Sequence, residues 1–391
     1  MTTAHSVLFG LILVSGIWSA YTFLLYPAAL PLLARFRHSR QPPPARHARP
    51  DELPRVALVI SAYNEQAVIR AKLENSISID YPAAQLGIWV SSDGSSDATC
   101  PIVREFARAN GRVRLIAHAV NRGKTAALLE TVRALPESID VVVFSDANSM
   151  YRTDAIRRLV SHFADPEVGC VAGELRYRTR SGEGAYRSYE NRIKRAQSQL
   201  GVPVVAEGSI FAIRRSLMPD LPSDSLEDMV IPLRIASAGY RVVYEPEAVS
   251  EEVFALSLAA QWKRRRRIVN RALRALASIP EARNPFRGGW TAFHFCSHRL
   301  MRWFSPFFLL AGWTSLLTLG FTDATASAAA RVLAGGTAVA VLLGAVMEWR
   351  RSGPRILRLV GAFAISNSAI LAGALSVLFR VKVVRWSPER R

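Results

Sequence analysis

The chain has 391 residues, of which 50 are basic and 31 acidic, and its formal net charge at pH 7 is +19. Such a basic balance favours anionic partners, and the apolar segments described below favour lipid headgroups and nucleotides over nucleic acid. The three cysteines, Cys100, Cys170 and Cys296, form no CxxC pair. This spacing argues against a cysteine zinc site or a disulfide framework and indicates a reducing compartment.

Residues 7–34 carry no charge, and a tilted membrane span needs about 20 or more such residues. The segment lacks the basic start of a secretion signal and is longer than a signal's apolar core. Arg35, Arg37 and Arg40 follow at once, so the positive-inside rule predicts an outside N-terminus. We expect a transmembrane helix over residues 1–35 and an extended, basic and proline-rich linker over residues 36–54.

Residues 55–250 alternate short apolar runs with helical patterns, which is typical of a doubly wound α/β sheet. In the first half we expect strands at RVALVISA, LGIWVSS, RVRLIAH and VVVFS, with helices over residues 66–78, 98–109 and 123–134. In the second half we expect strands at GCVAGELRYR, EGSIFAIRR and YRVVYEPEA, a helix over residues 186–200 and another ending at residue 238. Ligands of such sheets bind at the carboxyl ends of the strands.

Residues 253–276 repeat apolar side chains at spacings of three, four or seven around the run KRRRR at 263–267. This pattern predicts an amphipathic helix in the membrane interface, and a solvated surface helix is the alternative. We assign residues 251–302 to interface helices and residues 303–391 to transmembrane helices with a basic tail. Apolar segments cover residues 303–322, 332–347 and 359–379, and the middle one is short for a span.

The charges beyond the last apolar segment conflict with a count of four spans. Four crossings from an outside N-terminus would leave the C-terminus outside. The positive-inside rule instead predicts a cytosolic end, because the tail carries several basic residues: Arg380, Lys382, Arg385, Arg390 and Arg391. A re-entrant or interfacial C-terminal segment would resolve the conflict.

Acidic and amide residues follow two of the expected strands. Asp93, in DGSSD, has a carboxylate that can accept hydrogen bonds from a base or ribose; alternatively, the motif is a turn or helix cap. Asp146 and Asn148 end the VVVFS strand. Their oxygens can coordinate a hard divalent cation that bridges a diphosphate; capping of the following segment is the alternative.

Three further motifs carry candidate chemistry. The turn 121–124 offers helix amides and the ammonium of Lys124 to a phosphate. Glu227 and Asp228 lie in an expected loop ahead of a helix, where one carboxylate could act as a general base, or both could simply favour the helix start. A third set shares one helix face and could bind a diphosphate, an acceptor or lipid: Gln261, Arg264 and Arg265.

In this order, the motifs YNE, DGSSD, NRGKTAAL, SDAN, EGSIFAIRR, LED and QxxRR resemble the membrane-bound processive branch of glycosyltransferase family 2. That branch includes cellulose, hyaluronan, chitin-oligosaccharide and poly-N-acetylglucosamine synthases. The resemblance also covers SHRLMRWFSPFFLL and RWSPERR, and so runs over nearly the whole chain. It implies a cytosolic GT-A domain with a doubly wound mixed sheet over residues 55–250 and about four transmembrane helices in the inner (plasma) membrane. It also implies a nucleotide-sugar donor, usually a UDP-sugar, and Mg²⁺ or Mn²⁺.

The resemblance also implies roles for single residues. Tyr63, Glu65 and Asp93 would surround the nucleoside, and Lys124 would approach the diphosphate. Asp146, with Asn148, would bind the metal. Asp228 would be the general base of an inverting displacement, oriented by Glu227. The helix motif would embrace the diphosphate and the acceptor end: Gln261, Arg264 and Arg265.

Two departures from the family pattern bear on the product. Asn148 stands where a second aspartate is usual, which lowers the expected metal affinity. Arg265 stands where a tryptophan usually stacks beneath the acceptor sugar. The missing tryptophan weakens the case for a long processive polymer and leaves room for a single or limited addition. From the resemblance we expect a growing glycan as acceptor, with single transfer to a lipid-linked acceptor and an inactive sugar-nucleotide-binding subunit as alternatives. Anionic lipids are expected partners, and a homo-oligomer or a partner protein could complete an export channel; no nucleic acid is expected.

Overall fold

The computed structural model describes residues 3–36, 53–177, 182–202, 205–223, 225–252, 257–276, 279, 289–323 and 327–381. Most of the expected linker and the basic tail beyond residue 381 lie outside this range. The chain divides into two compact units. The α/β unit comprises residues 33–255, 274–292 and 384–391, and the membrane unit comprises residues 1–32, 256–273 and 293–383.

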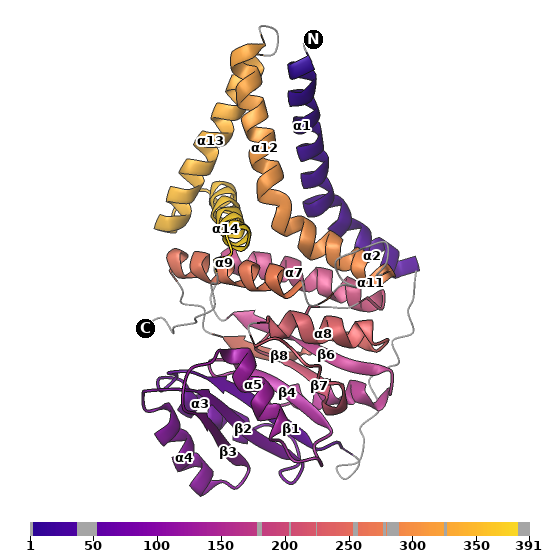
Figure 1. Ribbon diagram of the computed structural model, residues 1–391, viewed down its shortest axis with the longest axis vertical. Helices are drawn as coiled ribbons and strands as arrows, with labels where there is room; N and C mark the ends of the chain where they lie inside the picture. Colours follow the sequence, from indigo (N-terminus) through magenta and orange to yellow (C-terminus); the bar gives the residue numbers. More distant parts are fainter. Residues whose placement is uncertain are drawn as a thin grey trace. The chain divides into compact units, whose positions relative to one another are not determined.

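The α/β unit is built on an eight-stranded mixed sheet with the order β3-β2-β1-β4-β7-β6-β8-β5 (Figure 1). Strands β1 to β4 are parallel, β7 is antiparallel to β4 and β6, and β6 and β8 are parallel. The predicted doubly wound mixed sheet is confirmed. The strands are β1 (Val56–Ala62), β2 (Leu86–Asp93), β3 (Val113–His118), β4 (Val141–Asp146), β5 (Met150–Tyr151), β6 (Val168–Tyr177), β7 (Phe211–Arg214) and β8 (Arg241–Glu252).

Helices cover both faces of this sheet. They are α3 (Ile69–Ile77), α4 (Thr99–Ala109), α5 (Lys124–Arg133), α6 (Ala155–Ser161), α7 (Gly182–Gln199) and α8 (Glu227–Ser237). The central strand β1 is buried on both sides: Leu58 packs into one apolar cluster and Val59 into the other. This two-sided burial explains the continuous apolar run that predicted the strand. Strand β5 and helix α6 were not predicted, because two and seven residues are too short for a clear period.

The membrane unit contains the apolar helices. They are α1 (Thr3–Ala20), α2 (Tyr26–Phe36), α9 (Leu258–Ala275), α11 (Gly289–Phe295), α12 (Met301–Thr322), α13 (Ser327–Arg350) and α14 (Arg355–Leu378). Four segments are long and apolar enough to cross a membrane: Thr3–Arg35, Gly289–Thr322, Ser327–Arg350 and Arg355–Leu378. The expectation of a short middle segment was wrong. Helix α13 has 24 residues, because an alanine-rich start and the sequence MEWR extend the helix beyond its apolar centre.

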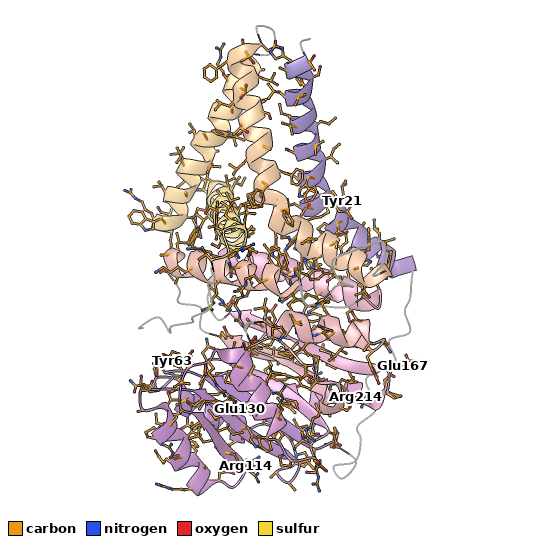
Figure 2. The ribbon with its side chains drawn as sticks, viewed as in Figure 1. Tyr21, Tyr63, Arg114, Glu130, Glu167 and Arg214 are labelled. Carbon is orange, nitrogen blue, oxygen red and sulfur yellow. The ribbon has the colours of Figure 1, made fainter. Side chains whose placement is uncertain are left out.

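Polar side chains join the N-terminal helices to α11, to the start of α12 and to the turn between them within the membrane unit. The indole of Trp18 donates to the Met301 carbonyl at 3.1 Å. The Tyr21 and Ser297 hydroxyls lie 2.9 Å apart (Figure 2), and the Tyr26 hydroxyl lies 2.8 Å from His294 Nδ1. π-Helical turns over Tyr21–Leu25 and Cys296–Leu300 adjoin these contacts. Such interhelical bonds fix the packing of apolar helices, which gain little from hydrophobic burial in lipid.

Candidate active site

The loops that follow β1 and β2 are bonded to each other at the carboxyl ends of these parallel strands. Asn64 adopts a positive φ of 53°, and its Oδ1 accepts a hydrogen bond from the Ser96 amide at 2.8 Å. The Glu65 amide donates to Thr99 Oγ1 at 2.8 Å. The YNE and DGSSD motifs therefore form one rigid structure, which holds the half-buried ring of Tyr63 at the edge of the α/β unit (Figure 2).

Asp93 is 5% exposed and anchors the turn that precedes α5. Its Oδ1 and Oδ2 accept hydrogen bonds from the amides of Arg122 and Gly123, each at 2.8 Å. Gly94 permits this approach, since a Cβ there would lie 2.5 Å from the Asn121 nitrogen. The amides of Arg122 and Gly123 ahead of α5 thus already donate to Asp93, and phosphate binding by the helix amides and Lys124 stays a prediction. A contact between Asp93 and the nucleoside stays a prediction.

Lys124, the first residue of α5, bridges two acidic positions that are distant in sequence. Its Nζ lies 2.6 Å from Asp146 Oδ1 at the end of β4 and 3.0 Å from Glu227 Oε1. The hydroxyl of the neighbouring Thr125 donates to Glu227 Oε2 at 2.9 Å. Burial disfavours the charge on Lys124, but the two carboxylates outweigh burial and raise its pKa above the ordinary lysine value. The ammonium group is therefore charged at neutral pH.

Glu227 and Asp228 occupy the first turn of α8 and not a loop, which corrects the expectation. Leu226 before them is extended, and the helix dipole favours acids at this end. Asp228 Oδ2 accepts a hydrogen bond from the Gly208 amide at 3.2 Å. The side chain of Glu227 contacts Lys124 and Thr125. That Glu227 also orients Asp228 stays a prediction.

Gly208 is a site residue to which the sequence assigned no role. A Cβ on Gly208 would lie 3.1 Å from Lys124 Nζ and 3.4 Å from Asp228 Oδ2. Both functional groups therefore face the space that the missing side chain leaves open. The available signal was a glycine inside the expected strand EGSIFAIRR, since a glycine in a strand often marks a close approach by another group.

Asp146 and Asn148 could hold a divalent cation. Both are half-buried, whereas the alternate residues Ala147 and Ser149 are buried. Their carboxylate and amide oxygens are donors that Mg²⁺ and Mn²⁺ accept. Among the residues that the structure describes, no three or more His, Cys, Asp or Glu side chains form a metal-binding group. The donor set therefore fits an ion that is bound chiefly through the phosphates of a ligand.

A buried lysine that the sequence did not reveal braces the loop after β4. Lys72 of α3 has no exposed surface. Its ammonium donates to the Ser149 carbonyl and lies 4.1 Å from the Tyr151 ring centre. The Ser149 hydroxyl in turn donates to Glu252 Oε1 at 2.5 Å. Burial lowers the pKa of Lys72 to about 7, against the opposing effect of nearby carboxylates. This network links α3 and the end of β8 to the proposed metal loop.

The remaining predicted site residues belong to α9 in the membrane unit. Gln261, Arg264 and Arg265 are half-buried on that helix, and the helical spacing expected for them is confirmed. The guanidinium of Arg265 donates to the hydroxyl of Ser366 in α14. Their roles at a diphosphate or acceptor stay predictions.

Comparison with known proteins identifies the family. Residues 54–270 match the family described as glycosyltransferase like family 2. Poly-beta-1,6-N-acetyl-D-glucosamine synthases from Staphylococcus epidermidis and Staphylococcus aureus (strain COL) are each 28% identical, over 221 and 226 residues. These alignments cover 54% and 55% of this chain and 52% and 54% of the relatives. The chain therefore spans about half the length of the curated relatives it matches.

A solved structure shares the fold. The mannosyltransferase PcManGT from Pyrobaculum calidifontis, in complex with GDP-Man and Mn²⁺, aligns with a TM-score of 0.71 and 23% identity. The alignment covers 95% of this chain and 99% of that one. The α/β unit thus has the architecture of a GT-A glycosyltransferase. Because the family match covers more than half of the chain and includes the strand-end acids, this protein belongs to glycosyltransferase family 2.

Proposed function

We propose that this protein transfers a sugar from a UDP-sugar to the end of a growing glycan, with inversion at the anomeric carbon. The observation that carries the proposal is the position of Lys124, which bridges Asp146 and Glu227 beside Asp228 and the gap at Gly208. A donor diphosphate needs a positive charge beside it, which Lys124 would supply. An acceptor hydroxyl needs a carboxylate that can take its proton, which Asp228 would supply. The named relatives, which are polysaccharide synthases, support the choice of a glycan acceptor.

The donor would lie across the carboxyl ends of the parallel strands. Tyr63, Glu65 and Asp93 would contact the nucleoside, and the protonated Lys124 would face the diphosphate. Asp146 and Asn148 would hold Mg²⁺ or Mn²⁺. When bound, the divalent ion supplies neutralising charge for the leaving nucleoside diphosphate. Because Asn148 brings no charge, this ion is expected to bind more weakly than at a site with two aspartates.

Asp228 would act as the general base in a single displacement. As the acceptor oxygen bonds to the anomeric carbon, the carbon–oxygen bond to the diphosphate breaks and the hydroxyl proton passes to Asp228. Asp228 is one of the carboxylates that raise the pKa of Lys124, so the two side chains lie close enough to interact. Glu227 would keep Lys124 in place through the ion pair between them. Gly208 would leave room for the attacking hydroxyl.

A second candidate function is transfer of a single sugar to a lipid-linked acceptor. The observation that favours it is Arg265, which stands where a stacking tryptophan is usual in the polymerases and which donates to Ser366. An arginine held in this way offers no flat platform for successive sugars. Gln261 and Arg264 would then meet the phosphate of the acceptor lipid as well as the donor.

We infer the cellular setting from the same features. The four apolar segments would anchor the protein in the inner membrane, with the GT-A domain over residues 55–250 in the cytosol. Residues 251–302 would form the interface region, where basic side chains face anionic lipids. A second copy or another protein could complete an export path for a long glycan.

The test is a donor screen on the full chain in native-like membrane. Release of nucleoside diphosphate is measured with a panel of UDP-sugars and GDP-mannose, and products are sized by mass. A ladder of lengths from one UDP-sugar supports the synthase, whereas a single adduct on lipid supports the alternative. No turnover of any donor would overturn both and leave an inactive binding subunit. Chelation with EDTA is expected to reduce turnover strongly, and metal-independent turnover would remove the metal role of Asp146.

A further inference from the structure

Helix α14 runs in a different direction from the other apolar helices of the membrane unit. Figure 1 shows α1, α12 and α13 extended along the unit, whereas α14 is seen down its own axis and so lies across them. Its length and composition would allow it to cross a membrane. Its direction within the unit is that of a helix lying parallel to the membrane plane.

Hydrogen bonds join the C-terminal half of α14 to the basic helix α9. The indole of Trp262 donates to Ser368 Oγ at 3.0 Å. Arg266 donates to Ser376 Oγ through Nε at 3.2 Å and through Nη2 at 3.0 Å. Figure 1 shows α9 along its length and α14 end-on, so the two helices cross, and these bonds connect α9 with Ser368 and Ser376 of α14 near the crossing.

Two further contacts extend this pairing. Asn270 Nδ2 donates to the Val381 carbonyl at 3.0 Å, just beyond the end of α14. At Gly373, a Cβ would lie 2.7 Å from the Arg266 carbonyl oxygen. The helix backbones therefore approach closely where they cross, and the C-terminal half of α14 rests against the basic helix α9 there.

The charge on α9 fixes the membrane depth of this contact. Residues 263–267 read KRRRR, and arginine is strongly disfavoured at the centre of a bilayer. If α14 crossed the membrane, Ser368 would lie near the centre of the bilayer and Ser376 toward its far side. Arg266, which donates to Ser376, would then lie inside the bilayer as well. At the headgroup level, the same arginines meet water and phosphate.

The two sides of α14 suit this position. Exposed apolar side chains gather within about one third of its circumference at 100° per residue: Ile356, Leu359, Phe363 and Leu378. Ser368, Gly373 and Ser376, which meet α9, lie on other sides. An interfacial helix has such an arrangement, with one side toward acyl chains and another toward the polar surface.

We propose that α14 is an interfacial helix on the cytosolic leaflet and that the chain crosses the membrane three times, through α1–α2, α12 and α13. Three crossings from an outside N-terminus return the C-terminus to the cytosol. This topology places Arg350 and Arg355, before α14, on the same side as Arg380 after it. The basic tail then obeys the positive-inside rule, which four crossings would violate.

The sidedness test compares three single-cysteine variants of the full chain, made after replacement of Cys100, Cys170 and Cys296. Ala324→Cys lies between α12 and α13, Ser352→Cys between α13 and α14, and Glu389→Cys in the tail. A membrane-impermeant maleimide is applied to intact and to permeabilised cells. We expect Glu389→Cys to label like Ser352→Cys and opposite to Ala324→Cys. Labelling of Glu389→Cys together with Ala324→Cys would overturn the proposal.

A depth measurement tests the same proposal without reference to the tail. Fluorescent labels at Ile356→Cys, Phe363→Cys and Leu378→Cys are quenched by lipids brominated at defined acyl-chain depths, in vesicles of phosphatidylcholine and phosphatidylglycerol. An interfacial helix gives a similar shallow depth for all three labels. A spanning helix would give a deep label at residue 363 between two shallow ones, and that pattern would overturn the proposal. Val339→Cys, in the middle of α13, is the matched control and should report a deep position.

Discussion

The two halves of the sheet supply functional groups in different ways. In the parallel half, β3-β2-β1-β4, the candidate residues follow strands directly: Asp93 ends β2 and Asp146 ends β4. In the mixed half, they come from the turn before β7, at Gly208, and from the first turn of α8, at Asp228. Lys124 joins the halves through its ion pairs with Asp146 and Glu227. In the proposed function, donor binding falls mainly to the parallel half and proton transfer to the mixed half.

The sharpest test of this division is Asp228→Asn. The amide oxygen can still accept the Gly208 hydrogen bond, but the side chain can no longer take a proton. We expect turnover to fall by roughly 10²–10⁴-fold, the usual contribution of a general base, while nucleotide affinity stays close to that of the wild type. Turnover and equilibrium binding of the nucleotide are measured on the same preparation.

The control for this variant is Asp220→Asn. Asp220 is almost fully exposed and pairs with Arg133 on the surface, so its replacement should change neither quantity. Full activity in Asp228→Asn would remove the base assignment. Loss of nucleotide binding in that variant would instead show that Asp228, in the mixed half, also takes part in donor binding.

A smaller effect is expected from Gly208→Ala, at the junction of the halves. The added methyl would lie 3.1 Å from Lys124 Nζ and 3.4 Å from Asp228 Oδ2. The flexible lysine can yield by a few tenths of an ångström, so folding should survive. Because small misplacements of reacting groups are costly, we expect turnover to fall by roughly 10–100-fold, mainly through the acceptor step.

Steady-state kinetics with donor and acceptor varied separately would locate that loss. The matched control is Gly111→Ala, where a Cβ would meet nothing within 4 Å. If Gly208→Ala behaved like Gly111→Ala, the gap beside Asp228 would not be the place where the acceptor hydroxyl binds.

The sequence predicts the parallel half well because its signals are local. The run VALVI at the start of β1 is apolar throughout, as a strand buried on both faces requires, and the strand-end rule then locates Asp93 and Asp146. It predicts the mixed half less well: whether Glu227 begins a helix or lies in a loop depends on tertiary contacts such as the Thr125 bond. Hydropathy likewise gives the length of α14 but not its direction.

Lys72 shows most clearly what a sequence pattern cannot reveal. In the helical stretch AKLENS it is typical of a solvated surface lysine, yet it is wholly buried beneath the loop of Asp146 and Asn148. Its environment comes from β5 and β8, elements distant in sequence, through Ser149 and Glu252. Helical periodicity cannot show this, because the partners that permit a buried ammonium are supplied only by the folded sheet.

The smallest effect on turnover is expected from Lys72→Met, whose main consequence is a changed pH dependence of stability. Burial lowers the pKa of Lys72 from 10.5 to about 7. Between these values, the unfolded chain holds a proton on this amine that the native protein has released. The free energy of unfolding therefore rises with pH across this window, by up to about 1.4 kcal/mol per pH unit from this group. Lys72→Met removes that contribution, so its thermal midpoint should rise less than that of the wild type between pH 7 and 9, by several degrees.

The control is Lys263→Met, at an exposed position on α9, which should keep the wild-type dependence of the thermal midpoint on pH. Equal slopes in Lys72→Met and the wild type would mean that Lys72 stays protonated in the native protein, held by Asp146 and Glu252 more strongly than burial opposes it.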